Sequence, residues 1–126
     1  MSVEAYSGRT LAFLGDAVWS LAVRRYLLAQ GQGKGKQLQK LSISYVSAKA
    51  QARFYEQLHE RHFFTEWEEE IFRRGRNANS GAVPKNTDVQ IYRISTGFEA
   101  ILGALDIEGK PERVEQILQA AIEIQE

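Results

Sequence analysis

The chain has 126 residues, 44% of them hydrophobic and 25% charged, with no cysteine. This length suits one domain with its own core, and the lack of cysteine excludes a disulfide framework and a thiolate zinc site. Sixteen basic residues balance sixteen acidic ones, so bulk charge does not indicate a nucleic-acid partner. No apolar run approaches the ~20 residues that span a bilayer, and no signal-peptide pattern begins the chain. We therefore expect a cytoplasmic protein without a membrane partner.

The first half of the chain predicts three helices. Apolar spacing favours a helix from about Arg9 to Ala29, with Leu11, Leu14, Val18 and Leu21 expected on its apolar side. A following glycine ends it. The glycine-rich segment 31–36 then forms a linker with some basic character. Shorter helices are expected over Lys36–Tyr45 and from Ala48 to about Glu60, the latter with a serine as its N-cap.

The second half also predicts helices, each with its own start signal. Thr65 and Glu68 form a capping-box pattern that begins a helix ending at Gly75. Turn residues are then frequent from 77 to 86.

A second capping-box pattern, Thr87 with Gln90, precedes a helix expected over 88–105. Pro111 is placed to open the last helix. Because no useful stretch alternates like a strand, the sequence predicts an all-α domain around one core.

One carboxylate, Asp16, lies inside the strongly apolar segment 13–18, beside Gly15. A charge buried in such a segment is costly unless it is paired or binds a metal, and glycine weakens a helix by roughly 1 kcal/mol relative to alanine. Asp16 and Gly15 side by side therefore indicate that another part of the backbone approaches the helix closely next to this acid. The alternative is an aspartate on the polar side of an amphipathic helix, with Gly15 allowing tight helix packing.

A second carboxylate, Glu99, lies in a similar apolar segment, 98–105. If the two predicted helices pack side by side, Asp16 and Glu99 can converge. Mg²⁺ typically takes one or two carboxylates plus water and phosphate oxygens, which is a minimal site for phosphodiester hydrolysis. Alternatively, the acids form structural ion pairs, for which the candidate partners are Arg24, Arg25 and Arg93.

The balanced total charge hides a basic window between residues 73 and 93, with acidic flanks. This window has Asp88 as its single acid, and its basic members are Arg73, Arg74, Arg76, Lys85 and Arg93. A polyanion-binding segment and an ordinary solvated loop explain it equally well.

Several segments together resemble a known family. Residues 13–18 resemble the signature segment of the ribonuclease III catalytic domain, and residues 98–104 resemble its second acidic motif. Residues 73–80, 83–90 and 95–100 resemble the Mini-ribonuclease III branch of that family. The resemblance covers nearly the whole chain, and no double-stranded-RNA-binding domain is expected after it.

The resemblance implies that Asp16 and Glu99 are the catalytic and metal-binding residues. Other acids of the larger family are replaced here by Arg9, Ala12 and Thr96. The replacements at Ala12 and Thr96 themselves resemble the Mini-ribonuclease III pattern. How many metal ions bind at once stays open, since a two-metal site needs several bridging ligands.

The function that the resemblance implies is a homodimeric endoribonuclease with a ribonuclease III-like helical fold. It would use Mg²⁺, with Mn²⁺ as a substitute, to cut double-stranded RNA and leave 5′-phosphates. The implied substrate is the base-paired stalk of the large-subunit (23S) ribosomal RNA precursor, with a ribosomal protein as a further candidate partner. Two alternatives remain open: a catalytically weak RNA-binding member of the fold, and a helical dimerisation module without nucleic acid.

A catalytic domain that grips A-form RNA by itself must do so mainly through phosphates, 2′-hydroxyls and shape. We expect the loop from Arg73 to Thr87, and the start of the helix after residue 47, to make these contacts. The apolar segment around Trp19, together with the helix that carries the signature segment, is expected to form part of a dimer interface. The expected RNA contacts are Arg73, Arg74, Arg76, Asn77, Asn79, Ser80, Lys85, Asn86 and Thr87, with Ser47, Lys49 and Gln51 as weaker candidates.

Overall fold

A computed structural model describes residues 2–31, 33–78, 83, 85 and 88–126 of the chain. In these ranges there is no β-strand, so the prediction of an all-α fold is confirmed. None of the described helices is both long and apolar enough to span a membrane. A short 3₁₀-helix that was not predicted comes first, and the elements are η1 (Val3–Ala5), α1 (Gly8–Ala29), α2 (Lys36–Val46), α3 (Ala48–Glu60), α4 (Glu66–Arg76), α5 (Val89–Ile107) and α6 (Pro111–Gln125).

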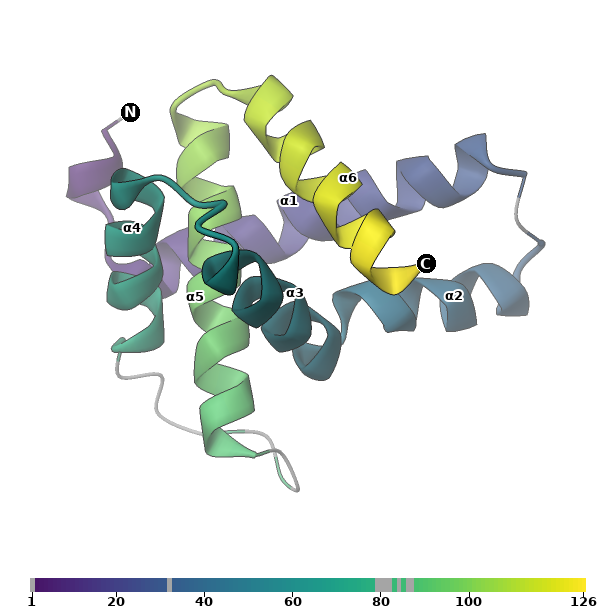
Figure 1. Cartoon of the computed structure of the whole chain (residues 1–126), viewed down its shortest axis with the longest axis horizontal. Coiled ribbons are helices and arrows are strands. Elements are labelled where there is room, and N and C mark those ends of the chain that lie inside the picture. Colours follow the sequence, from purple (N-terminus) through teal and green to yellow (C-terminus); the bar gives the residue numbers. More distant parts are fainter. Residues whose placement is uncertain (1, 32, 79–82, 84, 86–87) are drawn as a thin grey trace.

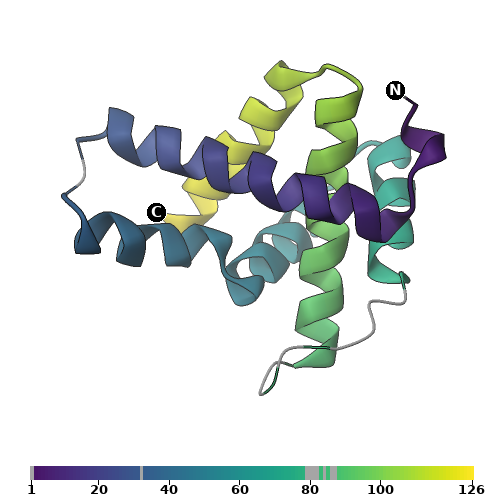
Figure 2. The ribbon, with the colours of Figure 1, turned by 180° about the vertical axis from the view of Figure 1, so that it is seen from behind.

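Helix α5 is the centre of the fold. Helices α1, α3, α4 and α6 all pack on it. Helix α4 runs beside α5, and α1 passes across α5 behind the view of Figure 1 and in front of it in Figure 2. From Ser95 to Leu105 every residue of α5 except Glu99 is buried, as expected for a helix that is apolar on all sides. Glu99 is thus a single acid within a core helix.

The buried stripe of α1 follows a spacing of four residues and includes Leu11, Gly15, Trp19, Val23 and Leu27. The predicted apolar side was different, because it continued to Leu21, whose exposed fraction is 52%. A helix with 3.6 residues per turn carries that position out of the core.

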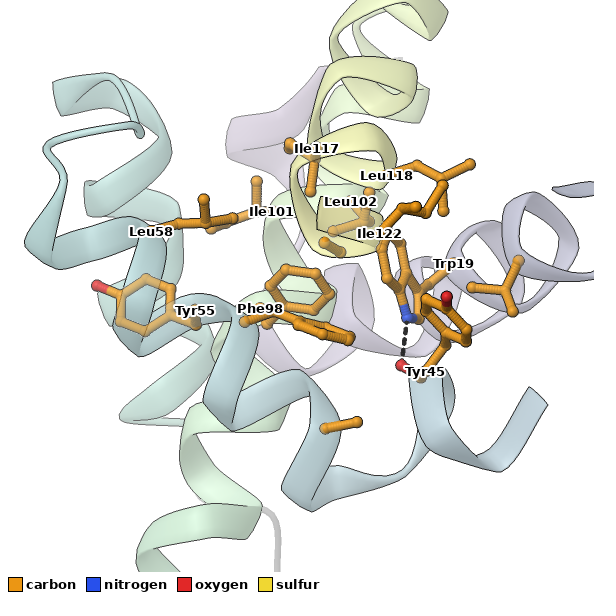
Figure 3. Packing of buried hydrophobic residues seen from close by; sticks show 14 of the residues in the cluster. Trp19, Tyr45, Tyr55, Leu58, Phe98, Ile101, Leu102, Ile117, Leu118 and Ile122 are labelled. Carbon is orange, nitrogen blue, oxygen red and sulfur yellow. Dashed lines mark hydrogen bonds between the residues drawn. The ribbon is translucent and has the colours of Figure 1, made fainter. Parts of the chain in front are cut away.

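Trp19 itself belongs to the core, so it does not contribute to the dimer interface predicted along this segment, which stays a prediction. It is fully buried, and its indole Nε1 donates a hydrogen bond to the backbone oxygen of Tyr45 at 2.9 Å (Figure 3). Its ring meets the edges of Phe54 and Phe98. Because these contacts reach α2, α3 and α5, Trp19 joins four helices and presents nothing to a second molecule.

Helix starts follow the sequence signals closely. The N-cap hydroxyl of Thr65 accepts from the backbone N–H of Glu68 at 3.1 Å, and the Glu68 carboxylate accepts from the backbone N–H of Thr65 at 2.9 Å. The capping box is thus confirmed. The start of α5 was placed one residue too early: Asp88 is its N-cap and accepts from the backbone N–H groups of Gln90 and Ile91, while Thr87 lies outside the described residues.

Glu68 also fastens α6 to the start of α4. Only 2% of this glutamate is exposed, and its two carboxylate oxygens each accept from the guanidinium of Arg113 at 2.8 Å. Arg113 donates in addition to the backbone oxygen of Phe63 at 2.9 Å, and it lies over the Phe63 ring. Every polar atom of this buried ion pair has a partner, as a stable buried pair requires.

Candidate active site

The site begins where the backbones of α1 and α5 touch. A Cβ atom at Gly15 would lie 1.6 Å from the backbone oxygen of Glu99, and one at Gly103 would lie 2.0 Å from the backbone oxygen of Leu11. Both distances are far below van der Waals contact, so only glycine allows this crossing. The close backbone approach expected beside Asp16 is therefore present. Asp16 itself is exposed, so its placement matches the alternative of an aspartate on the polar side of the helix with tight packing at Gly15.

The crossing brings the two predicted acids together. Asp16 lies on the exposed side of α1, and Glu99 is half-buried on α5. Burial raises the pKa of Glu99 to about 8, and a hydrogen bond with the carboxylate of Asp16, together with its negative charge, contributes to this rise. At neutral pH and without a cation, Glu99 therefore holds a proton that it donates toward Asp16, as expected for two carboxyl groups sharing one site.

No basic side chain compensates these acids. Within the described ranges, neither Asp16 nor Glu99 has a lysine, arginine or histidine nitrogen within 4.0 Å, and the ion pairs found there are Glu68–Arg113 and His59–Glu69. The described residues therefore contradict the alternative in which Asp16 and Glu99 form structural ion pairs with arginines. The negative charge of the site is left for a ligand to neutralise.

Gln51 completes the surroundings of Glu99. It lies in the first turn of α3 with an exposed fraction of 1%, and its Nε2 donates to the backbone oxygen of Val46 at 3.0 Å and to Oε2 of Glu99 at 3.2 Å. Its Oε1 is buried and has no partner among the described residues. The expectation that Gln51 contacts RNA is corrected, because its side chain is turned inward onto an acid.

The donor set suits a hard divalent cation. Two carboxyl groups meet there, with the amide of Gln51 against one of them, and oxygen donors are the ligands that Mg²⁺ prefers. In the part of the chain that the structure describes, no group of three or more histidine, cysteine, aspartate or glutamate side chains is placed to hold a metal. The described residues therefore supply few ligands, which leaves coordination positions for water and phosphate oxygens.

The three arginines of the basic window lie on a helix. Helix α4 continues to Arg76, so the expectation that Arg73, Arg74 and Arg76 belong to a loop is wrong. Basic residues in a last helical turn are favoured by the helix dipole, which explains their place without RNA. Arg73 and Arg76 are exposed, whereas Arg74 is half-buried and donates to the backbone oxygen of Tyr6. Arg74 therefore helps to hold the start of the chain against α4.

The remaining predicted RNA contacts divide into two groups. Lys49, Asn77 and Lys85 are exposed, and Ser47 is the N-cap of α3, where its hydroxyl accepts from the backbone N–H of Ala50 at 3.2 Å. The other four predicted contacts lie outside the described residues, and they are Asn79, Ser80, Asn86 and Thr87.

Two surface features were missed in the sequence. Large apolar side chains are exposed on α1, with 83% of Phe13 and 66% of Leu28 accessible, and Ile43 on α2 is 54% accessible. The segment from Ala17 to Tyr55 also contains no acidic residue. Its basic residues are all exposed, and they are Arg24, Arg25, Lys34, Lys36, Lys40, Lys49 and Arg53. A search for runs that lack acids would have found this second basic region.

Comparisons with known proteins agree on one family. A family model described as the Ribonuclease III domain matches residues 9–110. A Mini-ribonuclease 3 from Streptococcus pneumoniae is 46% identical over 123 residues, which cover 98% of this chain and 96% of that protein. A Mini-ribonuclease 3 from Staphylococcus aureus is also 46% identical, over 91% of this chain and 86% of its own length. The crystal structure of a Fusobacterium nucleatum protein superposes with a TM-score of 0.83 at 33% identity, covering 96% of this chain and 95% of that one.

Proposed function

The chain belongs to the Mini-ribonuclease III branch of the ribonuclease III family and is an endoribonuclease. We propose that it uses Mg²⁺ to cut double-stranded RNA, at a site formed where α1 crosses α5. The observation that carries the proposal is the meeting of Asp16 and Glu99 without a cationic partner in the described part of the chain. Mn²⁺ has the same preference for oxygen ligands, so we expect it to substitute.

Asp16 and Glu99 would hold the cation together. When bound, Mg²⁺ would lower the pKa of a water molecule that acts as the nucleophile and would neutralise charge on the attacked phosphate. Glu99 must first lose its proton, because the pKa of its carboxyl is raised to about 8. The two carboxylates then act as one unit, and the glycine crossing fixes their separation.

We propose that the enzyme works as a homodimer. Cutting both strands of a duplex requires two active sites, which a two-fold axis relates most simply. The exposed apolar side chains of α1 lie on the helix that carries Asp16, with Phe13 83% accessible. A second copy of this chain would cover that face and set the distance between the two sites.

The natural substrate that we propose is the base-paired stalk of the 23S ribosomal RNA precursor, the substrate that resemblance to this branch implies. A ribosomal protein that presents this RNA is the candidate further partner, and the cytoplasm is the proposed location. Support from the molecule itself comes from Arg73 and Arg76, which are exposed in the last turn of α4, and from Lys85, which is exposed in the segment after α4. The segment 17–55 also has no acidic residue.

The test is cleavage of a duplex RNA with and without Mg²⁺ by the wild type, Asp16→Asn, Glu99→Gln and the double variant. Each single variant should lose at least ~10²–10³ in rate, as when electrostatic stabilisation is removed from an active site. The double variant should be little worse, because residues that act as a unit are not additive. A wild type that binds the duplex without cutting it would support the alternative of a catalytically weak RNA-binding member.

The homodimer has a separate test. Phe13→Asp places a charge on the exposed face of α1 and should convert the protein to monomers in light scattering at micromolar concentration. Circular dichroism should show unchanged helix content, because Phe13 does not touch the core. A wild type that is monomeric and still cuts both strands would contradict the proposal.

A further inference from the structure

We propose that Gln51 is a third residue of the metal site: its amide orients Glu99, and its buried Oε1 accepts a hydrogen bond from the hydration shell of the cation. This inference rests on the proposed metal-dependent function. It concerns a residue that is neither an acid nor part of the two acidic motifs.

The position of Gln51 follows from the start of α3. Ser47 caps that helix, so the side chain of Gln51 projects from the first turn toward α5, which packs on α3. There Nε2 reaches Glu99 Oε2 at 3.2 Å and the backbone oxygen of Val46 at 3.0 Å. One amide thus connects the end of α2 to the acid on α5.

The chemistry of the amide determines which atom faces which neighbour. A primary amide has two N–H donors and one carbonyl acceptor, and both partners of Nε2 are oxygen acceptors when Glu99 is ionised. The opposite orientation would place Oε1 of Gln51 against those oxygens. Gln51 therefore uses both donors, and its Oε1 is left to accept.

That Oε1 atom is buried without a partner among the described residues. Unpartnered buried polar groups are few in native proteins, and an absent water or ion is a common reason for one. Because Nε2 of the same amide lies 3.2 Å from Oε2 of Glu99, a water coordinated by a cation at Glu99 is a donor of the right kind, since Mg²⁺ usually keeps several waters. Residues that contact metal ligands or their waters in this way change affinity when they are replaced.

The competing explanation is that Gln51 only closes the junction between α2 and α3 through Val46. The two roles differ in what happens when metal is added. A junction residue changes the stability of the protein equally with and without the cation. A residue of the metal site changes the stabilisation that the cation itself produces, because binding to the folded state is linked to unfolding.

The experiment measures thermal unfolding of the RNA-free protein over a titration of Mn²⁺, for the wild type, Gln51→Met, Gln51→Glu and Ile117→Val. Gln51→Met keeps the size but removes the amide, and its apparent Kd for Mn²⁺ should rise by about tenfold. Gln51→Glu adds a third carboxylate, so its metal-free Tm should fall while its Mn²⁺-induced increase in Tm exceeds that of the wild type. Ile117 is fully buried on α6, and its variant should lower Tm with an unchanged Kd.

Two outcomes would overturn the inference, and they are distinguishable. If the wild type binds Mn²⁺ and both Gln51 variants keep its Kd, Gln51 is a junction residue, and the proposed function stands. If Mn²⁺ does not stabilise the wild type at all, the metal-dependent function fails and the role of Gln51 fails with it. Should Gln51→Met not fold, Gln51→Glu still decides, because its larger or unchanged response to Mn²⁺ separates the two roles.

Discussion

Glu68 and Glu99 are both withdrawn from solvent on helices that pack together, but their surroundings are opposite. Glu68 accepts two hydrogen bonds from Arg113 and one from the backbone of Thr65. Glu99 meets another carboxyl group, Asp16, and a neutral amide. The first carboxylate is fully compensated within the fold, and the second depends on a ligand.

The difference separates a residue that stabilises the fold from one that we propose serves the reaction. A paired, capped carboxylate holds α6 and α4 together, and breaking such a pair destabilises a protein strongly. A carboxyl whose pKa is raised by burial and by a like charge lowers the stability of the ionised, metal-free protein. Such perturbed groups in a defined site are typical of functional positions.

The largest effects should come from replacing each glutamate by glutamine. Glu99→Gln should lower the cleavage rate at saturating duplex RNA by ~10²–10³ and leave the free energy of unfolding unchanged or higher. Glu68→Gln should lower the free energy of unfolding by about 3 kcal/mol, because it leaves the Arg113 charge poorly compensated. For each variant, urea unfolding measures the free energy of unfolding, and the cleavage rate is expressed per folded molecule. Equal loss of stability in the two variants would contradict the comparison.

The glycine crossing should couple stability and activity. Gly15→Ala or Gly103→Ala forces the backbones of α1 and α5 apart, which should destabilise the protein by about 1–3 kcal/mol and also slow cleavage by displacing the acids. Gly109→Ala is the matched control: no atom lies within 4 Å of its added Cβ, and its φ of +68° should lower stability by about 1 kcal/mol with cleavage unchanged. Normal cleavage by a destabilised Gly15→Ala would show that the crossing does not position the acids.

The stability of the metal-free protein should depend on pH because of Glu99. The pKa of Glu99 is about 8 in the folded protein and 4.5 for an ordinary glutamate, so above pH 4.5 the folded state retains a proton that the unfolded state has lost. The free energy of unfolding of the metal-free protein should therefore fall as pH rises from about 5 to about 8. Saturating Mg²⁺ should reduce this fall, and Mg²⁺ affinity should increase with pH up to about 8.

Urea unfolding at several pH values, with and without Mg²⁺, measures this prediction. Glu99→Gln is its control, because a glutamine has no proton to retain and the contribution of this site should disappear. A wild-type pH profile that matches that of Glu99→Gln in the absence of metal would contradict the raised pKa.

The smallest effects should appear in RNA binding. The double variant Arg73→Ala with Arg76→Ala should need a higher RNA concentration for half-maximal rate. Its binding should also depend less on salt, because fewer phosphate contacts mean that fewer counterions are released when the RNA binds. The saturated rate should change little. Arg74→Ala should instead lower stability, because its guanidinium holds the backbone of Tyr6. A titration of rate against RNA at two salt concentrations separates these results, and a lost saturated rate in the double variant would place those arginines in the catalytic site.

Local signals in the sequence predicted the helices well. The capping box at Thr65 and Glu68, the N-cap at Ser47 and the proline that opens α6 each depend on residues within one helical turn. Such interactions are local, so a short stretch of sequence is enough to predict them. The error at the start of α5 was one residue, between two neighbours that can both act as caps.

Faces of helices were harder to predict than their bounds. Gln51 was expected on a surface and is buried, whereas Leu21 was expected on the apolar side of its helix and is exposed. Periodicity shows which residues share a side of a helix. It does not show which side meets a neighbour when apolar residues occur on several sides, as they do on α1.

The sequence by itself determined an all-α chain, its capped helices and the two acids that its motifs single out. Only the tertiary structure decided that Asp16 and Glu99 meet, that Gln51 donates to Glu99 and that Arg74 is tied to the start of the chain. The physical reason is that these contacts link residues far apart in sequence. Their geometry depends on how closely α1 approaches α5, and that approach is set by Gly15 and Gly103 together.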